Sequence, residues 1–251
     1  MAWRDRSEGL ERLLLTAAVF TAAVLIFTLY TRDARWRVCS TAEPDARIDA
    51  CTNIIESGYE PAGSLSRAFS NRGAGYRRKG DLVQAMDDYD QAVRLSRANS
   101  RALHNRAVLY GEQKDYDRAL TDLDRAIQID PLYANAWNAR CWTRILMGQA
   151  QQAVGDCTES LRLRPDDAVT LASRALAYLK LNRADRAITG YDAALKLAPK
   201  NASVLFGRGL AKHMKGEASA ATDIAAAQAI NAGIATQFEI YGVPSTASEP
   251  P

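Results

Sequence analysis

A repeat of 34 residues constrains this chain more than any other feature of its sequence. An alanine, an arginine and a small residue each recur at that spacing, in three separate registers. The registers are Ala85, Ala119, Ala153, Ala187 and Ala221; Arg72, Arg106, Arg140, Arg174 and Arg208; and Gly73, Ala107, Cys141, Ala175 and Gly209. They define an array over 66–235, made of the units 66–99, 100–133, 134–167, 168–201 and 202–235. A period of this length indicates stacked copies of one supersecondary unit.

Each unit is predicted to form two antiparallel helices. In 134–167, Trp137 and Cys141 are four residues apart and so share one helix face. Gly148 is placed to end the first helix, and Pro165 to end the second. Because one helical pair leaves a face uncovered, neighbouring pairs are expected to stack. Sparse glycine and proline beside abundant alanine and leucine agree with an all-α fold.

The repeat pattern resembles the tetratricopeptide repeat. In the first unit the resemblance is carried by Asn71, Arg72, Gly73, Tyr76, Gly80, Asp81, Ala85, Tyr89 and Ala92. It implies a right-handed α-solenoid of about five helical hairpins, whose concave face commonly binds peptides or other proteins. The unit 202–235 departs from the pattern, as end units of such arrays often do.

Two short helices are predicted to close the array. Ile48, Cys51 and Ile55 fall on one face of 45–58, which is expected to cap the first unit. Residues 236–242 are expected to form a C-terminal cap. The remaining segments are predicted to be an N-terminal segment at 1–12, a linker at 31–44 and a disordered tail at 243–251.

An uncharged run at 13–30 predicts a transmembrane anchor. Its 18 residues would form a helix about 27 Å long, close to the thickness of a bilayer's hydrocarbon core. A cleaved signal peptide and a buried helix of the domain remain open as alternatives. Three arginines precede the run and three follow it closely, so the positive-inside rule leaves the orientation undecided.

The four cysteines provide the argument for orientation. Cys141 and Cys157 occupy facing positions of one hairpin, and Cys39 and Cys51 bracket the start of the predicted cap. Two disulfides are predicted, which is typical of an oxidising compartment. The chain would then be a single-pass membrane protein with its array on the outer (periplasmic or envelope) side. Buried thiols in a cytosolic array remain the rival interpretation.

The resemblance also indicates which residues face the concave groove. They change from polar and basic to apolar along the array, which suits a peptide with matching ends. The predicted contacts are Arg67, Asn71, Arg101, His104, Asn105, Asn138, Trp142 and Phe206. In a second interpretation, Trp142 and Phe206 pack on each other or under the C-terminal cap.

The arginine register has two interpretations. Asp88, Asp122 and Asp156 follow the first three arginines by sixteen residues, which favours ion pairs between helices. Alternatively, the arginines form a ladder for anionic ligands.

No pattern of catalytic residues is present. His104 and His213 are the only histidines, and neither cysteine pair has the short spacing of a zinc site. A net charge of +3 is too small to argue for nucleic acid. The sequence therefore predicts a membrane-tethered scaffold that binds a protein or peptide partner, without enzymatic activity, cofactor or metal. The alternative is an accessory specificity subunit of an envelope enzyme or assembly complex.

Overall fold

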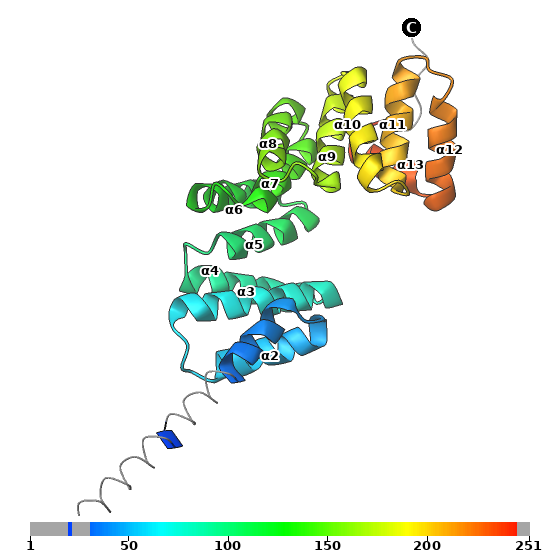
Figure 1. Cartoon of the computed structure of the whole chain (residues 1–251). Helices are drawn as coiled ribbons and strands as arrows, with labels where there is room; N and C mark the ends of the chain where they lie inside the picture. Colours follow the sequence, from blue (N-terminus) through cyan, green and yellow to red (C-terminus); the bar gives the residue numbers. More distant parts are fainter. Residues whose placement is uncertain (1–19, 22–30, 245–251) are drawn as a thin grey trace, which may run out of the picture. The chain divides into compact units, whose positions relative to one another are not determined.

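The computed structural model describes residues 20–21 and 31–244, and all regular secondary structure in these ranges is helical (Figure 1). The chain divides into two compact units, residues 1–97 and 98–251. The first hairpin of the predicted array lies in one unit and the other four lie in the second. The all-α helical repeat architecture is therefore confirmed, with the array split after its first hairpin.

The first unit contains α2 (Pro44–Glu56), α3 (Ala62–Lys79) and α4 (Leu82–Leu95), with α3 packed on both of its neighbours. The predicted cap at 45–58 corresponds to α2. The segment 31–44 was expected to be a linker, whereas its residues 31–41 are helical. A disulfide attaches this helical segment to α2, because it joins Cys39 to Cys51 with a Cα–Cα distance of 4.9 Å. Both cysteines are fully buried.

The second unit is a row of helical hairpins followed by one short helix. Its elements are α5 (Ser100–Glu112), α6 (Tyr116–Ile129), α7 (Ala134–Leu146), α8 (Ala150–Leu163), α9 (Ala168–Lys180), α10 (Ala184–Leu197), α11 (Ala202–Met214), α12 (Ala220–Ile230) and α13 (Ile234–Ile240). The first helix of each hairpin packs on its own second helix and on the first helix of the next hairpin. The helices α5, α7, α9 and α11 therefore line one continuous face.

Side-chain caps set where several of these helices begin. A side-chain oxygen of the residue before the helix accepts a hydrogen bond from a backbone N–H of the first turn, which has no partner within the helix. These capping residues are Asn99, Asp115, Asp167 and Asn201. Inside the hairpins, Ala119, Ala153 and Ala187 are fully buried, as their register predicts.

The last hairpin departs from this register. Ala221 is exposed, contrary to the expectation, and Ala220 is buried in its place. The turn between α11 and α12 spans residues 215–219, whereas residues 181–183 suffice between α9 and α10. The buried residues of α12 thus come one residue earlier than the repeat predicts, and Asp223 likewise follows Arg208 by 15 residues instead of 16.

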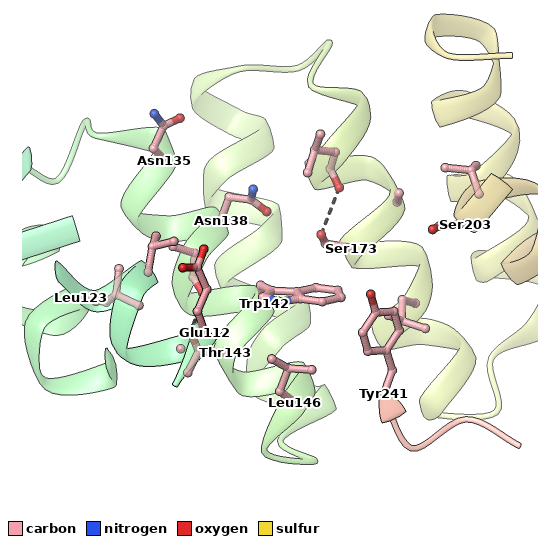
Figure 2. Close-up of a pocket in the computed structure, with 18 of the residues that line it drawn as sticks. Glu112, Leu123, Asn135, Asn138, Trp142, Thr143, Leu146, Ser173, Ser203 and Tyr241 are labelled. Atoms are coloured by element: carbon pink, nitrogen blue, oxygen red, sulfur yellow. Dashed lines mark hydrogen bonds between the residues drawn. The ribbon is translucent and has the colours of Figure 1, made fainter. Parts of the chain in front are cut away.

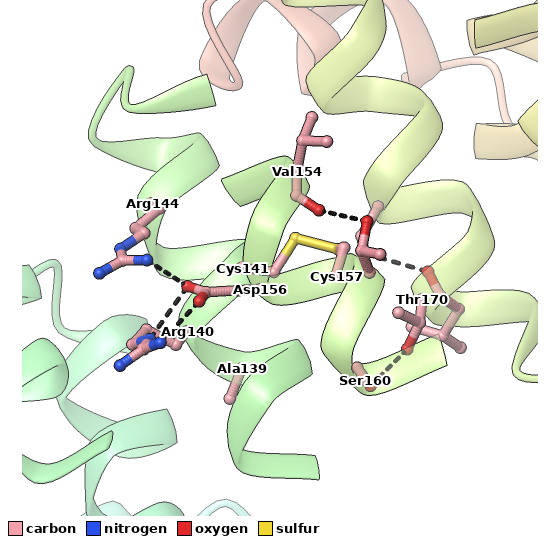
Figure 3. Close-up of a disulfide and its surroundings, with 12 residues drawn as sticks. Ala139, Arg140, Cys141, Arg144, Val154, Asp156, Cys157, Ser160 and Thr170 are labelled. Atoms are coloured by element: carbon pink, nitrogen blue, oxygen red, sulfur yellow. Dashed lines mark hydrogen bonds and ion pairs between the residues drawn. A yellow bond between two sulfur atoms is a disulfide. The ribbon is translucent and has the colours of Figure 1, made fainter. Parts of the chain in front are cut away.

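The second predicted disulfide links α7 to α8. Cys141 and Cys157 are fully buried, and their Cα atoms are 5.4 Å apart, within the range a disulfide requires (Figure 3). No free cysteine remains among the described residues.

Of the helices in the described ranges, none combines the length and the apolar character needed to cross a membrane. The predicted anchor at 13–30 lies outside these ranges except for residues 20 and 21, and the segment 1–12 lies wholly outside them. Of the predicted tail at 243–251, only residues 243 and 244 are described, and Val243 is buried.

Candidate binding groove

A groove of about 560 Å³ runs along the face formed by the first helices of the second unit. It is lined from α5 through α7 and α9 to α11, and α13 closes one end. Its polar and aromatic lining residues are His104, Glu112, Asn135, Asn138, Trp142, Thr143, Ser173, Tyr191, Asn201, Ser203, Phe238 and Tyr241. The groove thus lies on the first helices of the hairpins, where the resemblance to tetratricopeptide repeats predicts the partner to bind.

Trp142 forms the centre of the apolar part of the groove. Its half-buried ring packs edge-to-face on Tyr241, with 4.9 Å between ring centroids. Figure 2 shows Leu146 on one side of the indole and Ser173 on the other. Leu176 of α9 also lines this part. A mostly apolar wall with a few polar groups is typical of sites that bind small molecules or peptide side chains.

Asn138 supplies a polar group one helical turn before Trp142, and Figure 2 shows both side chains at the groove. Its Oδ1 atom is buried and finds no hydrogen-bond partner in the part of the chain that the structure describes. A buried acceptor left unpaired costs about 1–3 kcal/mol, so this oxygen favours a ligand that brings an N–H donor.

Hydrogen bonds from a lysine hold α13 at the end of the groove. The Lys180 ammonium donates hydrogen bonds to the carbonyl oxygens of Ile145 and Tyr241. Burial lowers the pKa of Lys180 from its ordinary value. These bonds tie the C-terminal end of α13 to α7 and α9.

The groove brings together three of the predicted contacts, His104, Asn138 and Trp142. Arg101 and Asn105 lie on α5 but do not line it. Phe206 does not line it either, contrary to the prediction. Its side chain is 1% exposed and packs on Phe238 of α13, with ring centroids 4.9 Å apart, because the apolar face of α13 covers it. Phe206 therefore packs under the C-terminal cap, as the second interpretation predicts. Trp142 also contacts the cap, through Tyr241, but it still lines the groove.

The two predicted contacts in the first unit, Arg67 and Asn71, meet residues of the helical segment 31–41. The Arg67 guanidinium lies over the ring of Trp36, 5.1 Å from its centroid. The side-chain amide of Asn71 lies 3.8 Å from the Cys39 sulfur. The helical segment 31–41 thus occupies the side of α3 on which these two residues were expected to meet a partner.

The first three arginines of the register form ion pairs, as one of its two interpretations predicts. Arg72, Arg106 and Arg140 each donate two hydrogen bonds to an aspartate sixteen residues later. Figure 3 shows Asp156 accepting from both Arg140 and Arg144. These bonds join the two helices of a hairpin, so the pairs are part of the packing between helices.

Several lining residues were not among the predicted contacts. Tyr241 comes from the predicted cap. Glu112 is the last residue of α5, and Ser203 lies at the start of α11. The sequence predicts that these residues lie on helices. The position of α13 at the end of the groove, however, depends on tertiary contacts of Phe238. Among the described residues, no group of His, Cys, Asp or Glu side chains is arranged to hold a metal ion.

Two segments match models of tetratricopeptide repeats. Residues 100–133 match one described as "Tetratricopeptide repeat", and residues 175–216 match one described as "TPR repeat". These two segments of the array are therefore tetratricopeptide repeats by sequence. No curated protein matches the sequence.

Solved structures share the fold at low sequence identity. A tetratricopeptide repeat protein from Parabacteroides merdae is 22% identical with a TM-score of 0.60, over 79% of this chain and 82% of its own. MamA from Desulfovibrio magneticus is 18% identical with a TM-score of 0.59, over 67% and 96% of the two chains. YrrB, presented as "a TPR protein with an unusual peptide-binding site", is 15% identical with a TM-score of 0.58, over 77% and 96%.

Proposed function

We propose that this chain is a non-enzymatic scaffold that binds an extended peptide segment of a partner protein in the groove around Asn138 and Trp142. The observation that carries the proposal is the unpaired Oδ1 of Asn138, buried in a groove of about 560 Å³. The main chain of an extended peptide offers N–H donors that are free to bond to such an acceptor. The peptide-binding site named for YrrB, which shares the fold, supports the same use of the array.

The apolar part of the groove predicts which peptide side chain lies next to the N–H group that bonds to Asn138. Trp142, Leu146 and Leu176 would surround an apolar side chain. Buried aromatic residues of this kind often dominate binding energy. The polar residues toward α5, including His104, would face a more hydrophilic end of the peptide. The partner segment is therefore expected to carry one large apolar anchor flanked by polar residues.

The proposal extends to a membrane tether through 13–30, with the array in an oxidising compartment. The uncharged run at 13–30 supports the tether. The two disulfides support the compartment, because such bonds are rare in the cytosol. Alkylation without reductant of protein taken from its own cells tests this part. Four alkylated cysteines would contradict it.

The groove is tested by selecting displayed peptides on the purified full-length chain and measuring their affinity by fluorescence anisotropy. Trp142→Ala is expected to weaken binding about thirtyfold, the effect of losing roughly 2 kcal/mol at an aromatic anchor. Asn138→Ala is expected to weaken it about fivefold. Trp137→Ala is the matched control, because Trp137 lies over Arg140 and donates to the Pro131 carbonyl. Equal effects of Trp137→Ala and Trp142→Ala would contradict the proposal.

A further inference from the structure

Four of the five register arginines hold the carboxylate of an aspartate in the same way. In each pair, Nε and Nη2 of the guanidinium donate to the two carboxylate oxygens, over 2.6–3.0 Å. The pairs are Arg72–Asp88, Arg106–Asp122, Arg140–Asp156 and Arg208–Asp223. A second carboxylate, from the preceding hairpin, joins two of them. Those contacts are Arg140–Asp124 and Arg208–Asp192, both at 2.7 Å.

Arg174 on α9 is the exception. Sixteen residues later, where three of the other arginines find an aspartate, the chain has Gly190. Sixteen residues earlier, where Arg140 and Arg208 find their second carboxylate, it has Thr158. Arg174 is half-buried and makes no ion pair, hydrogen bond or ring contact with the residues that the structure describes.

Neither neighbouring helix supplies a carboxylate at this register position. Thr158 is exposed, its hydroxyl donates to the Val154 carbonyl, and it makes no hydrogen bond with Arg174. Gly155, one turn earlier on the same face of α8, has no atom within 4 Å of the place where a Cβ would stand. On α10 a side chain is excluded, because a Cβ at Gly190 would lie 2.9 Å from the Ala175 Cβ. The register position therefore lacks a partner from either neighbouring helix.

We propose that Arg174 is a docking point for a carboxylate of a partner protein, an Asp or Glu side chain that enters between α8 and α10. The other hairpins show which group fits an arginine at this position, since each places a carboxylate there with two hydrogen bonds. A guanidinium binds a carboxylate through two parallel bonds, which gives both strength and orientation. Neither Arg174, Thr158 nor Gly190 lines the groove. The site is thus separate from the groove and does not rest on the function proposed for it.

The test uses the full-length chain and a fluorescent tetraglutamate peptide with blocked ends, followed by anisotropy at low ionic strength. Tetraglutamate is expected to bind, and tetraglutamine is not. Arg174→Ala is expected to weaken binding about tenfold, because it removes a charge-assisted hydrogen-bond pair. Thr158→Asp is expected to weaken it similarly, since it copies Asp124 and supplies a carboxylate within the chain.

Arg162→Ala is the control for charge alone. Arg162 is an exposed arginine of α8 whose side chain is 60% exposed, so its loss removes the same charge and is expected to change binding less than twofold. Equal weakening by Arg162→Ala and Arg174→Ala would overturn the proposal, as would a wild-type chain that does not bind tetraglutamate. Displacement of the peptide by inorganic phosphate but not by acetate at the same ionic strength would also overturn it, because the site would then select phosphate.

Discussion

The hairpins α7–α8 and α9–α10 are neighbours in one array, yet they are held together differently. In α7–α8, Asp156 bonds to two arginines and a disulfide crosses the interface. In α9–α10 the corresponding positions carry Gly190, Ala175 and Tyr191, with neither ion pair nor crosslink between them. The comparison shows that close apolar packing can replace the polar contacts of the repeat. Because Gly190 stands where α8 has Asp156, Arg174 lacks the carboxylate that Arg140 has.

The largest effect is expected at Asp156. Its side chain is 4% exposed and accepts hydrogen bonds from Arg140 and Arg144. Asp156→Asn would leave two guanidinium groups without their buried counter-charge and is expected to lower the free energy of unfolding by about 3–5 kcal/mol. Asp124→Asn removes the other partner of Arg140, but that side chain is 50% exposed, so the expected loss is under about 1 kcal/mol. Urea denaturation measures both, and equal losses would contradict this account of the hairpin.

The disulfide between α7 and α8 is expected to contribute the next largest effect. Closing a loop of about 15 residues stabilises a fold by about 3 kcal/mol in the chain-entropy model. The double change Cys141→Ala and Cys157→Ala is therefore expected to lower stability by about that amount, and added reductant should then have no further effect on this hairpin. A double variant as stable as the oxidised wild type would show that the crosslink does not stabilise α7–α8.

Two glycines test how closely the helices approach. Gly190→Ala places a methyl group 2.9 Å from the Ala175 Cβ and is expected to cost about 1–3 kcal/mol. Gly155→Ala meets no atom within 4 Å and is expected to stabilise α8 by up to about 1 kcal/mol, because alanine is the better helix former. Thermal melting of the two variants should shift in opposite directions. Shifts of the same sign would indicate that α10 does not pack as tightly on α9 as described.

The repeat made the hairpins predictable, because the spacing of alanines, arginines and small residues is a local property of the sequence. The aspartates at sixteen-residue spacing and the pair Cys141–Cys157 were predictable for the same reason, whereas Cys39 and Cys51 were predicted to pair from their positions around the start of the cap. The second carboxylates, Asp124 and Asp192, come from a neighbouring hairpin and needed the stacking distance between repeats. The register of the fifth hairpin was predicted wrongly, because the buried residues of α12 come one residue earlier than the 34-residue spacing places them.

The groove was predictable only in part. Asn138 and Trp142 follow from their positions on α7, but three residues expected at the binding face contact other parts of the chain. Phe206 is covered by α13, and both Arg67 and Asn71 contact the segment at 31–41, which was expected to be a linker. Both differences arise because short flanking helices fold back on the array. No periodicity in the flanks specifies that path.

The most direct test of the groove uses the four tryptophans of the full-length chain, labelled with 5-fluorotryptophan and observed by ¹⁹F NMR while a selected peptide is added. The Trp142 resonance, assigned by its loss in Trp142→Phe, is expected to shift as the peptide saturates the chain. The Trp137 resonance is expected to stay in place, because that ring lies over Arg140 and does not line the groove. A peptide that binds while the Trp142 resonance remains unchanged would contradict the account.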